Sequence, residues 1–334
     1  MKVGFTKHKV WMLFRWAVTQ MIPLALVLWV ALPVLPGYSQ QPDNPFGNLS
    51  GLSEPADSPW ENLTGWGAFR GIPDLATSAY ARAGDHLAVT VSLELEATVP
   101  VWVRVVVDGV AAKPDVVTFK SGSTARDGVR TFTFVKPNVG AGQHLIVVEA
   151  KLDPGTTVKV GRRAVSANTA SPDWGTGHLA VAYTTQTYHA TPIWANIPGL
   201  NTAVRTLSLS GPLIVHVSGT PSVTSGSLRV RAVIDGVPGN DVVLAEAGGN
   251  SRRGARTAIL IGPINTAGFH TVQIQATAPN GYLGVAAIAV EASGSGGRGG
   301  LAHTNIQGTL ATVSSTSWTT LDDSHSPLMP KPTL

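Results

Sequence analysis

The sequence predicts an all-β protein made of two tandem antiparallel β-sandwiches that follow an N-terminal export segment. One reason is an internal duplication, because VRVVVDGV at residues 103–110 returns as VRAVIDGV at residues 230–237. GVRT at 128–131 likewise returns as GART at 254–257. Matching positions stay 125 to 127 residues apart, which suits a folded domain and is far longer than a solenoid repeat.

A second reason is the period of two inside each copy. Residues 101–107 alternate valine with Trp102, Arg104 and Val106, so four valines share one face of a predicted strand. The matching run at 228–234 places on its inner face Leu228, Val230, Ala232 and Ile234. Both runs end in Asp-Gly, a dipeptide typical of two-residue hairpin turns.

A third reason is the even spacing of further short strands between Gly- and Pro-rich turns, which is typical of a sandwich. The predicted pairs, first copy before second, are 87–93 and 213–217, 130–134 and 256–261, 144–149 and 270–276, and 157–165 and 283–290. No stretch after the export segment shows a helical stripe.

Residues 1–39 have the order of a secretory signal peptide, with basic residues first, then an apolar stretch, then small residues at 37–39. The alternative is an uncleaved membrane anchor, because the apolar stretch approaches the length of a spanning helix. Either way we expect a secreted or cell-surface protein whose only contact with a membrane is this segment.

The rest of the chain divides into parts by composition and repetition. In order we predict a flexible stalk (40–60), the first copy (61–168), a linker (169–175), the second copy (176–293), a Gly-rich hinge (294–307), and a partial third copy with a disordered tail (308–334).

Charge and cysteine content exclude some classes of function. The chain has 24 Lys and Arg against 20 Asp and Glu, and four of the cations lie in the export segment, so 20 of each sign remain. Binding of nucleic acid needs a basic face, so we expect no nucleic-acid partner. The absence of cysteine excludes thiol catalysis, disulfides and cysteine-bound metals. We expect no cofactor and no metal.

His144 and His270 occupy matching positions and share strand parity with core residues such as Ile146 and Val272. A histidine at the first core-facing position of a strand usually closes the rim of the core, with a ring nitrogen bound to backbone. We predict this structural role for both, with a metal-binding or catalytic role as the alternative.

Arg130 and Arg256 begin matching strands and are also predicted to be structural, as members of ion pairs near the rim of each sandwich. Their expected partners are acids in nearby turns: Asp115 and Asp241, or the hairpin residues Asp108 and Asp235.

No spacing of residues matches a catalytic motif. The Ser and Thr residues lie in turns and outward strand positions, without the pattern of an activated nucleophile. A glycosidase needs two carboxylates, yet Glu149 corresponds to Gln275 and Asp153 to Pro279. We predict a protein that is not an enzyme, and a hydrolase is the least favoured alternative.

Tryptophan placement supports a binding alternative. Trp194 and Phe69 match in position, each three residues before an Ile-Pro pair. A tryptophan there is predicted to plug one end of the sandwich, although an exposed one could stack on a sugar ring. The possible ligand contacts are Trp66, Trp102, Trp174 and Trp194.

The DGV hairpins, with AGQH at 141–144 and AGFH at 267–270, give residues 60–293 a resemblance to immunoglobulin-like and jelly-roll modules of secreted bacterial surface proteins. The resemblance implies a spacer, adhesive or ligand-binding module and leaves both topologies open. The predicted function is a non-enzymatic structural or adhesive protein whose partner is an envelope or extracellular polysaccharide or protein. A carbohydrate-binding module is the alternative.

Overall fold

The computed structural model describes residues 51–53, 61–65, 67–120, 126–171, 178–206, 211–247, 254–264 and 266–292. All the regular secondary structure in these ranges consists of β-strands, so the all-β prediction is confirmed. No helix in the described part of the chain is long and apolar enough to cross a membrane. The predicted export segment, Gly-rich hinge and partial third copy lie outside the described residues.

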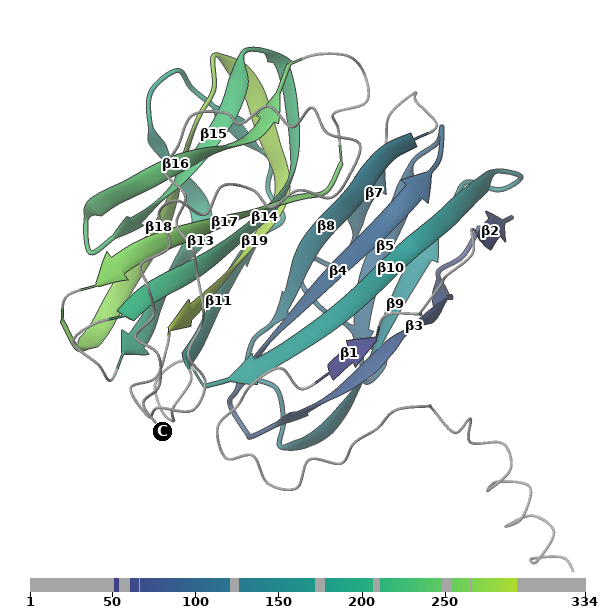
Figure 1. The fold of residues 1–334 in the computed structure, drawn as a ribbon, viewed down its shortest axis with the longest axis horizontal. Helices are drawn as coiled ribbons and strands as arrows, with labels where there is room; N and C mark the ends of the chain where they lie inside the picture. The colour runs from purple at the N-terminus through teal and green to yellow at the C-terminus, as the bar shows by residue number, and fades with distance from the viewer. Residues whose placement is uncertain are drawn as a thin grey trace, which may run out of the picture. The chain divides into compact units, whose positions relative to one another are not determined.

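The described residues of the first copy form ten strands. They are β1 (Gly51–Ser53), β2 (Glu61–Thr64), β3 (Arg70–Ala81), β4 (His86–Glu96), β5 (Val101–Val107), β6 (Val110–Ala111), β7 (Val117–Lys120), β8 (Arg126–Lys136), β9 (Gly142–Lys151) and β10 (Thr157–Ala170). Figure 1 shows them in purple to teal.

The second copy repeats this series at the expected offset. Its strands are β11 (His178–Thr184), β12 (Tyr188–Ala190), β13 (Ala195–Thr206), β14 (Gly211–Ser225), β15 (Ser227–Ile234), β16 (Val237–Glu246), β17 (Arg256–Ile264), β18 (Gly268–Thr277) and β19 (Asn280–Ala292).

Strand pairing decides between the two topologies left open by the sequence. One sheet of the first copy has the order β1-β10-β4-β8 with β2 also on β10, and the other has β3-β9-β5-β6 with β7 also on β5. We count β1 and β2 as one interrupted edge strand, and β6 and β7 as another. The first strand then pairs with the last (β10), β3 pairs with β9, β4 pairs with β8, and β5 pairs with the interrupted strand β6/β7. The second copy has the matching orders β11-β19-β14-β17 and β13-β18-β15-β16. This rolled antiparallel hairpin is a jelly roll.

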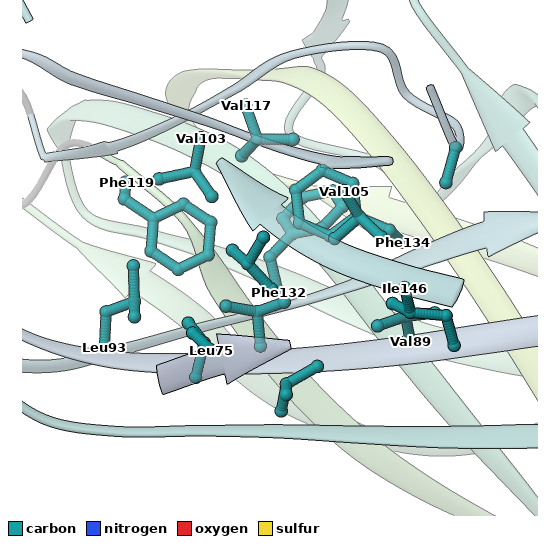
Figure 2. Packing of buried hydrophobic residues seen from close by; sticks show 14 of the residues in the cluster. Leu75, Val89, Leu93, Val103, Val105, Val117, Phe119, Phe132, Phe134 and Ile146 are labelled. Carbon is teal, nitrogen blue, oxygen red and sulfur yellow. The ribbon is translucent and has the colours of Figure 1, made fainter. Parts of the chain in front are cut away.

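The core of each copy follows the predicted alternation. Val101, Val103, Val105 and Val107 are all fully buried, and the residues between them are partly exposed. Figure 2 shows Val103 and Val105 near Phe119, Phe132 and Phe134. The rings of Phe132 and Phe134 lie 5.0 Å apart between centroids, a normal distance for packed aromatic side chains.

Two predicted boundaries differ from the structure. Residues 51–53, expected in the stalk, form β1 and pair with β10 along an edge whose backbone groups would otherwise lack strand partners. Strand β10 also continues to Ala170, past the predicted start of the linker.

The two copies are in contact with each other. All described residues of both copies belong to one compact unit. The first hydrophobic cluster includes Leu179, Ala255, Ala287 and Ala289 from the second copy. The backbone N–H of Thr133 also donates to Ser218 Oγ at 2.9 Å.

Candidate functional site

Each copy carries an Asp-Gly turn after the same strand, between β5 and β6 and between β15 and β16. Asp108 and Gly109 have φ angles of 51° and 81°, and Asp235 and Gly236 have 50° and 82°. Positive φ at both central residues defines the type I′ hairpin turn, which glycine adopts without strain and aspartate more readily than most residues. The predicted hairpins are therefore present in both copies.

In the first copy, the Asp108 carboxylate joins this turn to β9. Its Oδ2 lies 2.5 Å from His144 Nδ1, and its Oδ1 accepts the backbone N–H of Leu145 at 2.8 Å. The other ring nitrogen of His144, Nε2, lies 2.9 Å from the carbonyl oxygen of Gly140. His144 is 9% exposed, so its ring covers the rim of the core while it ties two loops together.

In the second copy, Asp235 and His270 make the same contacts between the turn and the strand. Asp235 Oδ2 lies 2.6 Å from His270 Nδ1, and Oδ1 accepts the backbone N–H of Thr271 at 2.8 Å. His270 Nε2 lies 3.0 Å from the carbonyl oxygen of Thr266 and 3.1 Å from Thr206 Oγ1. The ring is 2% exposed, which is deeper than in the first copy.

The hydrogen bonds of His144 in the first copy favour the charged form of its side chain. The Asp108 carboxylate and the Gly140 carbonyl can only accept, so both ring nitrogens of His144 must donate, which only imidazolium does. Burial alone would lower the pKa of His144, but the hydrogen bonds to Asp108 and Gly140 outweigh it and raise the pKa above its ordinary value.

The two aspartates respond in the opposite direction. Burial alone would raise the pKa of Asp108, but its hydrogen bonds with His144 and the Leu145 N–H lower it below the ordinary value. The pKa of Asp235 is lowered in the same way, because bonds from His270 and Thr271 outweigh the effect of burial. Both carboxylates are therefore ionised at neutral pH.

Thr206, His270 and Asp235 are hydrogen-bonded in series, as the nucleophile, base and carboxylate of a hydrolase would be. The sequence did not reveal this arrangement, because the three residues lie on two different strands and a turn. Thr206 is only 2% exposed, so its hydroxyl is closed to a substrate in this structure. The first copy has Ala81 at the matching position. Among the described residues, no group of three or more His, Asp or Glu side chains could hold a metal ion.

The acids expected as partners of Arg130 and Arg256 bind other side chains. Asp115 binds Lys113, with Nζ to Oδ1 at 2.7 Å, and Asp241 binds Nε of Arg229. Asp108 and Asp235 bind the two histidines, as described above. Arg130 is 1% exposed, and burial lowers the pKa of Arg256 below its ordinary value.

A second constellation lies on the outward face of the sheet β3-β9-β5-β6. Arg104 on β5 points away from the core, and its Nε donates to Glu149 Oε2 on β9 at 2.6 Å. The Arg104 guanidinium also lies 4.2 Å from the centroid of the Phe69 ring. Trp102, one of the predicted ligand contacts, is partly exposed on the same face, with Lys151 Nζ 6.0 Å from its ring centroid.

The second copy repeats this constellation with different side chains. The Arg231 guanidinium lies 4.3 Å from the centroid of the Trp194 ring, and its Nε donates to Gln275 Oε1 at 2.9 Å. Gln275 Nε2 in turn donates to Asn196 Oδ1 at 2.9 Å. Trp194, which was predicted to plug one end of the sandwich, is partly exposed and has the Arg231 guanidinium over its ring.

The sequence drew attention to the aromatic residue and the hydrogen-bond acceptor of each group, but not to the arginine. Sequence reasoning matched Phe69 with Trp194 and noted that Glu149 corresponds to Gln275, but it gave Arg104 and Arg231 no role. Their signal was available, because both arginines lie in the duplicated strand motif. Trp66 and Trp174, the other predicted ligand contacts, lie outside the described residues.

The comparisons with known proteins give no family and only weak structural similarities. No protein-family model matches the sequence. A search of curated proteins also gives no match. Among solved structures, PNGF-II aligns with a TM-score of 0.36 and 8% identity, covering 77% of this chain and 66% of its own. This chain therefore spans slightly under two thirds of the length of PNGF-II.

Two further solved structures show the same weak similarity. PNGase F, a glycosylasparaginase from Flavobacterium meningosepticum, aligns with a TM-score of 0.37 and 9% identity, covering 70% of this chain and 96% of its own. A Paenibacillus xanthan lyase aligns with a TM-score of 0.26 and 12% identity, covering 75% of this chain and 27% of its own. Scores this low say nothing about the activity of this chain.

Proposed function

We propose that the protein is exported and works at the cell surface as a non-catalytic structural or adhesive β-sandwich protein. The proposal is supported by the structural role of the polar residues that both copies share. Asp108 with His144, and Asp235 with His270, hold a turn to a strand. Both histidines are nearly buried, so their rings are closed to solutes and their bonds to the aspartates serve the fold.

Export and adhesion are tested together in a bacterial host that produces the full chain with its N-terminal segment. We expect the protein in the envelope or outside the cell, where added protease can reach it, and we expect beads coated with it to retain envelope fragments. A chain that stays in the cytoplasm, or coated beads that retain no more than albumin-coated beads, would contradict the proposal.

The non-catalytic part is tested by incubating the purified chain with model esters, peptides and glycosides. We expect no turnover above background. Turnover that disappears in His270→Gln, measured on protein shown to be folded, would assign catalysis to the second rim and overturn the proposal.

Carbohydrate binding is the second candidate function, and the two guanidinium–aromatic stacks favour it. Arg104 over Phe69 and Arg231 over Trp194 lie on outward sheet faces, so an aromatic ring and hydrogen-bond donors occur side by side near solvent. Such pairs can bind a sugar ring and its polar substituents at the same time.

A further inference from the structure

The two outward sheet faces share a geometry and differ in charge. In the first copy Arg104 binds Glu149, so the guanidinium and the carboxylate neutralise each other. In the second copy the residue bound to Arg231 is Gln275, which supplies the same hydrogen bond without a negative charge. The positive charge of Arg231 is therefore not cancelled by the side chain that positions it.

The acid that faces Arg231 in the strand register already binds another arginine. Asp241 on β16 is the cross-strand partner of Arg231 in the register, but its carboxylate binds Nε of Arg229. One carboxylate thus faces two guanidinium groups. Glu246, at the end of β16, pairs in register with Ser227 and lies further along the strand. A charge-complementary ligand for this position is an anion.

The surroundings of Arg231 hold it in a fixed orientation. Gln275 accepts from Nε, Asn196 accepts from Gln275, and the Trp194 ring covers one side of the guanidinium plane. The two terminal nitrogens remain as a planar pair of donors, which matches the two oxygens of a carboxylate. Trp194 is partly exposed beside them, so an apolar ring surface adjoins the anion position.

A second cation and ring lie further along the same face. Arg205 on β13 and Phe269 on β18 are cross-strand partners, and the guanidinium lies 5.8 Å from the ring centroid. Phe269 is 65% exposed. It lies on β18 six residues from Gln275, which corresponds to about 20 Å along a strand. The first copy has Tyr80 and Gln143 at these positions, without a cation.

We propose that the outward face of the sheet β13-β18-β15-β16 binds an acidic polysaccharide, with a uronate carboxylate on Arg231 and a sugar ring against Trp194. The proposal rests on the proposed adhesive function and names the ligand class for it. A chain with an acid on successive sugars suits a sheet face with cations at two separated points. Nucleic acid fits less well, because its affinity comes from many phosphate contacts on a strongly basic surface.

The test measures binding of an oligogalacturonate to the full chain by calorimetry at low salt, with a neutral cello-oligosaccharide of equal length as the comparison. We expect saturable binding of the uronate oligomer, weaker at high salt, and at least roughly tenfold weaker binding of the neutral one. Arg231→Gln should reduce the affinity roughly tenfold or more, and Trp194→Ala should reduce it by a smaller factor.

The duplication supplies matched controls. Gln275→Glu introduces the residue that the first copy already carries, so it should neutralise Arg231 and weaken binding as much as Arg231→Gln does, without unfolding the sheet. Arg104→Gln should leave the affinity unchanged. Glu149→Gln should free Arg104 and add a second, weaker site.

Several outcomes would overturn the proposal while leaving the adhesive function standing. They are no binding of the uronate oligomer, equal binding of the neutral oligomer, an affinity insensitive to Gln275→Glu, or tighter binding of a single-stranded oligonucleotide. If the adhesive function failed because the protein is not exported, the calorimetric result would still decide whether this face recognises uronates.

Discussion

The two copies have the same geometry at their rims and different chemistry on their outward faces. At the rims, Asp108 with His144 and Asp235 with His270 repeat nearly the same distances, 2.5 Å and 2.6 Å. On the outward faces, Glu149 in one copy is replaced by Gln275 in the other, although both bind an arginine. The rim contacts stabilise the turn, whereas the outward contacts decide which charge the surface presents.

The rims themselves differ in one respect. His270 has Thr206 Oγ1 within 3.1 Å, whereas the first copy has Ala81 at the matching position. The hydroxyl is a further partner for the buried ring, and His270 is less exposed than His144, 2% against 9%. The second rim is therefore expected to contribute more to stability than the first.

The largest expected effect follows from Asp235→Ala. The change removes the bonds from the Thr271 backbone, the Thr271 hydroxyl and His270, and leaves the imidazole buried beside an empty position. We expect unfolding free energy measured in denaturant to fall by about 3 kcal/mol. Asp241→Ala, which removes a half-exposed pair with Arg229, should cost less than about 1 kcal/mol and is the control.

Replacement of the histidines sharpens the comparison between the rims. His270→Ala and His144→Ala should each lower the free energy of unfolding by about 1–3 kcal/mol, with the larger loss for His270 because it is buried more deeply. Equal losses, or a larger loss for His144, would show that Thr206 and the deeper burial do not strengthen the second rim.

The pH dependence of stability tests the ion pair in the first copy. The pKa of His144 is raised in the folded state, so its contribution is complete below the ordinary value of about 6.5 and is lost as pH rises through the folded pKa. Thermal unfolding should therefore show a falling Tm as pH increases above neutrality, and the fall should be smaller in His144→Gln. An identical pH profile in that variant would contradict the assignment of imidazolium.

The loss of thermal stability at low pH involves an aspartate in each copy. The pKa values of Asp108 and Asp235 are lowered, so their contributions are complete above the ordinary value of 3.8 and disappear as pH falls through the folded values. Asp108→Asn and Asp235→Asn should each flatten the loss of Tm in acid. A profile unchanged by either substitution would show that other carboxylates control acid unfolding.

The smallest expected effect is that of Glu149→Gln on stability. The Arg104–Glu149 pair is partly exposed, with side-chain exposures of 34% and 20%, and the glutamine keeps an acceptor for Arg104. We expect a loss of about 0.5 kcal/mol in denaturant unfolding. A loss above about 2 kcal/mol would mean that the outward charges are part of the fold, and that their divergence between the copies is constrained by stability.

The fold class and the residues of the rims could be predicted from the sequence because their signals are local. Alternation along residues 101–107 separates inner from outer side chains, and an Asp-Gly pair specifies a hairpin turn within four residues. The partners of Asp108 and Arg231 could not be predicted in this way. His144 is 36 residues from Asp108, and Trp194 is 37 residues from Arg231, so the order of strands must be known first.

The sequence by itself determined that the chain contains two copies of one β-rich unit, which residues of each strand face the core, and where the hairpins turn. The tertiary structure decided the jelly-roll pairing, the placement of Trp194 against Arg231 and the partners of the charged residues. The physical reason is the range of the interactions. Alternation and turn preference act between neighbours in the chain, whereas β18 lies between β13 and β15 only after strands far apart in sequence have paired. That pairing places Trp194 and Arg231 in contact.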